Sequence, residues 1–110
     1  MKRTKAKLVE PKHPNIRIFV FTAKGCHFCK PHKTVVDAFA KAHPEVGIKY
    51  IDVSTAAPEE IRFALDHDVS SVPTTFFVDP RARVLASARE ACSPKLIQAL
   101  FDRALANGKA

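Results

Sequence analysis

Two cysteines three positions apart, Cys26 and Cys29, are the residues of this sequence best suited to chemistry. A thiol pair at this spacing can close into a disulfide and reopen as a dithiol, which exchanges two electrons with another thiol or disulfide. Only the thiolate attacks a disulfide, and a place at the start of a helix lowers a thiol pKa from about 8.5 toward roughly 3.5–7.5. The elements around the pair therefore decide which cysteine reacts.

An apolar run precedes the cysteines and a helical pattern follows them. Residues 16–21 (Ile-Arg-Ile-Phe-Val-Phe) are typical of a buried strand, and the apolar residues within 35–40 are spaced like the inner face of a helix. At this strand-to-helix junction we expect Cys26 to be the helix N-cap, with Cys29 one turn inside and close enough to form a disulfide. This placement predicts Cys26 as the nucleophile and Cys29 as the resolving thiol.

Four neighbouring side chains are candidates for tuning the thiol pKa values: Lys24, His27, Lys30 and His32. A protonated His27 beside Cys26 would lower its pKa, and the exposed lysines would add a weaker positive field. His32 falls on the inner face of the predicted helix, beneath Cys29. One hypothesis is that His32 accepts the proton of the Cys29 thiol, and the alternative is an ordinary structural histidine.

The composition is that of one globular domain. The 110 residues are 46% hydrophobic and 26% charged, and 18 basic against 11 acidic residues give a net charge of +7. Basic residues crowd the start of the chain, so we expect a basic, flexible segment over 1–14 and a folded domain over 15–107. Basic and aromatic residues do not alternate, which argues against a nucleic-acid partner.

The sequence shows neither the apolar core of a signal peptide nor an apolar run near 18 residues. We therefore expect no membrane span and a reducing, cytoplasmic location, or a periplasmic one if the chain is a processed form. Three cysteines make an odd number, which fits one reactive pair and one further thiol, Cys92. We expect Cys92 to be a small, partly buried residue; the alternative is a regulatory or glutathionylated thiol.

The rest of the chain predicts a mixed α/β domain. Strands are expected over 48–53, 72–79 and 84–88, with a weaker edge strand over 6–9. Pro58 and Pro94 are placed as first residues of helices. The inner face of the first of these helices would comprise Ile61, Ala64 and Leu65, and that of the second Leu96, Ile97, Leu100, Phe101, Ala104 and Leu105. The order β-α-β-α-β-β-α implies a mixed central sheet with helices on both faces.

This order, the Cys-x-x-Cys at the first helix start, and Val72-Pro73-Thr74 before a Phe-Phe-Val strand together resemble the thioredoxin superfamily. The resemblance covers about residues 16–106. It implies a thioredoxin-like fold and a cis Val72–Pro73 peptide next to Cys26. It also implies a substrate groove at Val72, Pro73 and Thr74, where the Val72 backbone would pair with an extended segment.

Several positions depart from the family pattern. Val20 stands where thioredoxins have a buried aspartate, Gly25 replaces the usual tryptophan, and His27-Phe28 replaces Gly-Pro between the cysteines. Glu90 stands where a glycine precedes the last helix. These differences set the chain apart from an ordinary thioredoxin in its expected substrates and in its coupling to a reductase.

The sequence predicts a monomeric thiol-disulfide oxidoreductase that needs no cofactor, reduces protein disulfides and exchanges electrons with an unidentified thiol partner. The opposite direction, as an oxidant or isomerase of an exported compartment, stays open because His27 would make the disulfide more oxidising. Three other functions also stay open. These are a zinc or iron–sulfur site using Cys26, Cys29 and His32, a binding module without turnover, and glutathione binding with contacts at Thr74 and Lys24.

Overall fold

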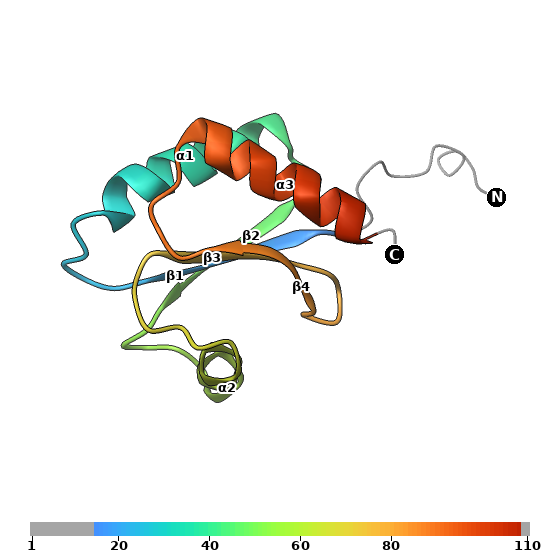
Figure 1. The fold of residues 1–110 in the computed structure, drawn as a ribbon. Helices are drawn as coiled ribbons and strands as arrows, with labels where there is room; N and C mark the ends of the chain where they lie inside the picture. Colours follow the sequence, from blue (N-terminus) through green and yellow to red (C-terminus); the bar gives the residue numbers. More distant parts are fainter. Residues whose placement is uncertain (1–14, 109–110) are drawn as a thin grey trace.

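The computed structural model describes residues 15–108 (Figure 1), so the predicted basic segment 1–14 and the edge strand predicted over 6–9 lie outside the described residues. The elements are β1 (Arg17–Thr22), α1 (Cys29–Ala42), β2 (Gly47–Asp52), α2 (Pro58–Asp66), β3 (Thr74–Val78), β4 (Val84–Ala88) and α3 (Pro94–Gly108). The predicted order of elements is confirmed, and α3 continues one residue past the predicted end of the domain.

The four strands form one mixed sheet in the order β2-β1-β3-β4. β1 pairs parallel with β2 and antiparallel with β3, and β3 pairs antiparallel with β4. Helices α1 and α3 cover one face, and α2 covers the other (Figure 1). Because β1 and β3 are central and covered on both sides, their sequences are nearly continuous apolar runs rather than alternating ones. The predicted mixed sheet with helices on both faces is confirmed.

The face under α1 and α3 carries the larger core. Its buried side chains come from β1, β3, β4 and both helices, and they include Ile18, Val20, Val36, Phe77, Ile97, Leu100 and Phe101. Four of the six predicted inner residues of α3 are buried, and Leu96 and Leu105 pack partly against them. The hydrophobic stripe of α3 is therefore what attaches this helix to the sheet.

The face under α2 is filled mainly by aromatic rings. Phe63 of α2 lies between Phe21 and Phe76, with ring centroids 6.0 and 5.1 Å away. The predicted inner face of α2 is wrong in two of its three members, because Ile61 and Leu65 are 46% and 71% exposed. The helix is instead turned so that Phe63 and Ala64 contact the sheet. A large ring between two others buries more apolar surface than the aliphatic residues would have done.

Two polar details fix the ends of α2. Pro58 is its first residue, as predicted, and the Glu60 carboxylate accepts a hydrogen bond from the backbone N–H of Ala57 at 2.8 Å. At the other end, the Arg89 guanidinium donates to the carbonyl oxygens of His67 and Asp68, both at 2.6 Å. Since Arg89 follows β4, this contact ties α2 to the segment that leads into α3. Among residues 15–108, no helix is both long and apolar enough to span a membrane.

Candidate active site

A tight turn carries the chain from β1 to the cysteines, at one edge of the molecule (Figure 1). The Cys26 N–H donates to the Ala23 carbonyl oxygen at 3.1 Å, and Gly25 has φ +77°. A positive φ at the third position of such a turn suits glycine, because a side chain there is strained. The structure thus gives a backbone reason for glycine at the position where the family has tryptophan.

Cys26 and Cys29 are joined by a disulfide, with their Cα atoms 5.3 Å apart. The expectation that Cys26 caps the helix is wrong, because α1 begins at Cys29 with Phe28 as its N-cap. A separate turn comes first, in which the Cys29 N–H donates to the Cys26 carbonyl oxygen at 3.3 Å. Pro31 is consequently the third residue of α1, where its missing N–H removes no intrahelical hydrogen bond.

The two cysteines differ in how deeply they are buried. Cys26 is half-buried at the rim, whereas Cys29 is only 8% exposed. The Cys26 Sγ atom also lies 3.8 Å from the carbonyl oxygen of Val72. A molecule arriving from solvent therefore meets Cys26 first, next to the Val72 backbone.

The Val72–Pro73 peptide is cis, as the resemblance predicted. Pro73 and Thr74 are buried, and the Thr74 hydroxyl donates to the Ser71 carbonyl oxygen at 2.7 Å. Thr74 thus uses its hydroxyl inside the loop that carries the cis proline, and it is not presented to a glutathione molecule. Of the three predicted groove residues, Val72 is the one that lies at the surface beside Cys26.

Three lysine side chains lie in the lining of a pocket beside the disulfide. This pocket, of about 360 Å³, is lined by Thr22, Ala23, Lys24, Gly25, Cys26, Cys29, Lys30, Lys33 and Tyr50. Lys24 and Lys30 are exposed and form no ion pair within residues 15–108. His27 is exposed as well. Its ring makes an edge contact with the Phe28 ring, and the two ring centroids are 5.9 Å apart.

Lys33 and Tyr50 are members of this pocket that the sequence did not single out. The Lys33 ammonium lies 2.7 Å from the Asp37 carboxylate and 4.8 Å above the Tyr50 ring. The Tyr50 hydroxyl donates to the same carboxylate, so the pKa of Asp37 is held below its usual value by its bonds to Lys33 and Tyr50. Burial, followed by the bond to Asp37, raises the pKa of Tyr50. Tyr50 as a whole is partly buried and packs against the edge of the core under α1 and α3.

His32 is fully buried on the inner side of α1, where the sequence placed it. Its Nδ1 accepts a hydrogen bond from the Cys92 backbone N–H at 2.9 Å, and its Nε2 lies 2.7 Å from the Thr75 hydroxyl oxygen. Burial lowers the pKa of His32. Because both ring nitrogens have partners, these hydrogen bonds favour a structural role over the predicted transfer of the Cys29 proton.

Cys92 is buried directly before α3. Its Sγ lies 3.6 Å from the Glu90 carbonyl oxygen, and burial, followed by the negative charge of Glu90, raises the pKa of the thiol to about 11. A thiol with so high a pKa is almost entirely protonated near neutral pH, so it is a poor nucleophile. This agrees with the interpretation of Cys92 as a small buried residue.

Val20, at the position of the family's buried aspartate, is fully buried and has Tyr50 and Thr75 as its register partners on the two neighbouring strands. Within the part of the chain that the structure describes, no group of three or more cysteine, histidine or acidic side chains is arranged to hold a metal ion.

Thr75, the partner of the His32 ring, is another residue that the sequence did not single out. Two threonines within an otherwise apolar central strand were the available signal, because a buried hydroxyl needs a partner.

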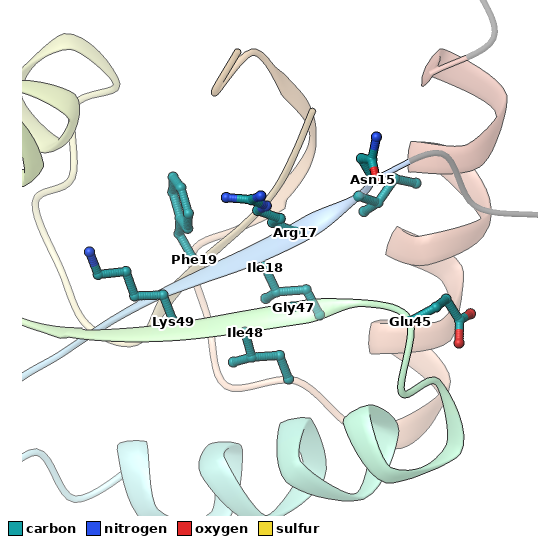
Figure 2. Close-up of a pocket in the computed structure, with 9 residues that line it drawn as sticks. Asn15, Arg17, Ile18, Phe19, Glu45, Gly47, Ile48 and Lys49 are labelled. Carbon is teal, nitrogen blue, oxygen red and sulfur yellow. The ribbon is translucent and has the colours of Figure 1, made fainter. Parts of the chain in front are cut away.

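A second hollow, of about 400 Å³, lies at the other end of β1 (Figure 2). Its lining comes from residues 15–19 and from 45 and 47–49, and it shares no residue with the pocket beside the disulfide. The Lys49 ammonium that borders it is 2.6 Å from the Glu60 carboxylate. This hollow is thus separate from the pocket beside the disulfide, at the opposite end of β1.

Neither protein-family models nor the sequences of characterised proteins match this chain. Solved structures do match it. The thioredoxin of Fasciola hepatica is 26% identical, with 89% of each chain covered and a TM-score of 0.67. Malaria parasite thioredoxin-2, a component of protein secretion machinery, is 22% identical and covers 81% of this chain and 82% of its own, with a TM-score of 0.68.

Mitochondrial thioredoxin 3 of Saccharomyces cerevisiae, in its oxidised form, is 21% identical, covers 83% of this chain and 81% of its own, and has a TM-score of 0.65. At these identities the likeness concerns the fold. The site adds a disulfide of Cys-x-x-Cys spacing between β1 and α1, beside a cis proline. The chain thus has the thioredoxin-like fold, and its Cys26–Cys29 pair is consistent with a protein of the thioredoxin superfamily.

Proposed function

We propose that this protein is a thiol-disulfide oxidoreductase in which Cys26 is the nucleophile and Cys29 the resolving thiol. The observation that carries the proposal is the unequal burial of the two cysteines in one disulfide. Cys26 is partly exposed beside the Val72 carbonyl, while Cys29 is buried at the start of α1. The thioredoxin structures that resemble this chain support the same chemistry.

The reaction begins from the dithiol. The Cys26 thiolate attacks one sulfur of a substrate disulfide, a mixed disulfide forms, and the other substrate sulfur leaves as a thiolate that takes up a proton. The Cys29 thiolate then attacks the Cys26 sulfur and releases the second substrate thiol. The substrate gains two electrons and two protons, and the protein is left with the Cys26–Cys29 disulfide.

The charges around Cys26 suit the attacking thiolate. Lys24 and Lys30 are exposed near its sulfur, and His27 adds a positive charge when protonated. A positive field stabilises a thiolate, although solvent screening weakens the contribution of exposed groups. We assign these three residues the role of favouring the Cys26 thiolate. Val72 has the role of receiving an extended substrate segment, and the buried Pro73 the role of placing the Val72 backbone.

The proposed direction is reduction of protein disulfides by a monomer in a reducing compartment such as the cytoplasm. A thiol donor would then restore the dithiol. The alternative direction, oxidation or isomerisation in an exported compartment, requires a more oxidising disulfide. The two directions predict different midpoint potentials.

The test is a titration of the protein in thiol/disulfide buffers of graded potential, with free thiols trapped by alkylation and counted by mass. A midpoint near about −270 mV is expected for a reductant, and one between about −200 and −120 mV would favour the oxidant or isomerase. If no Cys26–Cys29 disulfide forms at any potential, the redox function fails.

A pair of matched variants tests the roles of the two cysteines. Cys29→Ser should retain attack but lose resolution, so a mixed disulfide with a protein substrate should accumulate and be visible without reductant. Cys26→Ser should form none. Mixed disulfides in equal yield from both variants would contradict the assignment of the nucleophile.

A further inference from the structure

The buried ring of His32 joins three parts of the chain that are far apart in sequence. It belongs to the first turns of α1, its Nε2 lies 2.7 Å from Thr75 Oγ1 on β3, and its Nδ1 lies 2.9 Å from the Cys92 backbone nitrogen just before α3. All three residues are buried, with His32 and Thr75 at 0% exposure. We call these two hydrogen bonds the His32 link.

The partners determine which nitrogen carries the proton. A backbone N–H can only donate, so Nδ1 must present its lone pair to Cys92. The neutral ring then carries its hydrogen on Nε2, which donates to the Thr75 hydroxyl oxygen. Both ring nitrogens are satisfied in this single tautomer, and each bond lies between buried residues.

The His32 link connects the same two segments that meet at the disulfide. His32 lies three residues after Cys29, and Thr75 lies two residues after the cis Pro73. On the outer side of the same junction, Cys26 Sγ lies 3.8 Å from the Val72 carbonyl oxygen. The segment that leads into α1 therefore lies against the segment that leads into β3 at the surface, and the His32 link joins α1 to β3 in the core.

A disulfide forms only when its two Cα atoms lie within about 4.4–6.8 Å and its side chains converge. In the dithiol, Cys26 and Cys29 are joined only through the short backbone between them, so the position of the start of α1 sets how well their side chains converge and hence the effective concentration of one thiol at the other. That effective concentration is part of the equilibrium between the dithiol and an external disulfide.

We propose that His32 is a positioning residue for the cysteine pair: through Thr75 and the Cys92 amide it holds the start of α1 where the Cys26–Cys29 disulfide closes. This inference rests on the proposed redox function and adds the residues that set its equilibrium. A contact that stabilises both redox forms equally would cancel in the midpoint, so a shifted midpoint separates positioning from simple stabilisation.

The test compares Thr75→Val and His32→Leu with wild type and with Thr34→Val, a matched change at an exposed threonine of α1 outside the His32 link. Each protein is equilibrated with reduced and oxidised glutathione, in which the dithiol and one glutathione disulfide give the protein disulfide and two glutathione thiols. We expect Thr75→Val to lower this equilibrium constant about tenfold, which is about 30 mV toward a more oxidising midpoint. His32→Leu should shift it in the same direction, and Thr34→Val should leave it unchanged.

The outcomes separate the two proposals. If wild type never forms the disulfide, the redox function itself fails. If wild type titrates but Thr75→Val stays within twofold of it, or shifts toward a more reducing midpoint, the positioning role of His32 is overturned. Circular dichroism establishes that each variant is folded, and Thr75→Val decides alone if His32→Leu does not fold. The ring ¹⁵N shifts of His32 add a direct measurement: the Nε2–H tautomer supports the His32 link, and the Nδ1–H tautomer contradicts it.

Discussion

On the face of the sheet covered by α1 and α3, a large apolar core encloses a histidine, a threonine hydroxyl and a backbone N–H that satisfy one another. On the face covered by α2, the described core is apolar and rich in aromatic rings apart from Thr74, whose buried hydroxyl donates to the nearby Ser71 carbonyl oxygen, and no residue of the helix is fully buried. Both faces belong to the same strands. Neighbouring residues of β3 therefore serve different purposes, since successive side chains point to opposite faces.

The difference shows where this fold holds polar groups that join distant segments, because the Thr74 bond is local and the two His32 bonds are not. A buried imidazole is costly unless its nitrogens are hydrogen-bonded, and two helices shield its bonds from water better than one short helix. The face with the thicker cover is also the one from which α1 presents Cys29. The face under α2 contributes to the stability of the sheet. The face under α1 and α3 does so as well, and it also holds in place the helix that carries Cys29.

The largest expected effect comes from two adjacent phenylalanines on opposite faces. Phe76→Ala and Phe77→Ala should each lower the free energy of unfolding by about 3–5 kcal/mol, because each ring is buried among other rings. Only Phe77→Ala should also move the redox midpoint, since Phe77 contacts the α1 and α3 side through Phe39 and Phe101. Urea unfolding and the glutathione titration measure the two effects, and an equal midpoint shift in Phe76→Ala would contradict the division between the faces.

Cys92 provides a second test of the two-helix face. Its pKa of about 11 leaves roughly two orders of magnitude less thiolate than a thiol of ordinary pKa at pH 8, so alkylation in the folded dithiol should be slower than at Cys26 by at least that factor. Mass spectrometry after timed labelling measures both rates. In urea the rate at Cys92 should approach that of a free peptide thiol. Fast labelling in the folded protein would show that the segment before α3 opens readily.

Most of the fold could be predicted because it follows from local patterns. The apolar runs of β1 and β3, the proline at the start of α2 and the stripe of α3 are all contained in short windows of sequence. The first residue of α1 was misplaced because two consecutive turns, one requiring Gly25, precede the helix. The inner face of α2 was misplaced because a nine-residue helix offers too few residues to define its orientation, and the fit of Phe63 between two rings decided it.

The cysteine pair was predictable for a similar reason, since spacing and the flanking elements define it. The His32 link was not, because its partners lie 43 and 60 residues away in the sequence and one of them is a backbone N–H. A sequence pattern can mark His32 and Thr75 as polar residues at buried positions. It gives no information about a main-chain donor that only the tertiary structure brings to the ring.

The third prediction concerns the loss of stability at acidic pH. In the folded protein the pKa of His32 lies below 6.5, so below that pH the unfolded chain binds a proton that the folded chain excludes. Stability from this residue is fully present above pH 6.5 and falls as the pH decreases toward the folded pKa, by at most about 1.4 kcal/mol per pH unit. Denaturant unfolding at pH 7.5 and 5.5 should show a larger loss of stability in wild type than in His32→Leu. Equal losses would mean that protonation of His32 is not excluded.

The smallest effect is expected on the outer side of α2. Leu65 is 71% exposed, so Leu65→Gln should change the free energy of unfolding by no more than about 0.5 kcal/mol. Ile61→Gln, at a 46% exposed position, serves as a second variant on the same side. A loss above about 1 kcal/mol in either, measured by urea unfolding, would show that the aromatic face has more cover than α2 provides.

The Cys92 amide has a consequence for hydrogen exchange. It stands outside the helices and strands, where amide protons usually exchange with deuterium quickly, yet it points into the core at the His32 ring. Its exchange requires the segment before α3 to separate from α1, so its protection factor is a direct measure of that opening. The exchange rate of this one amide, in the connection between β4 and α3, thus measures how often the segment separates from the buried side of the redox site.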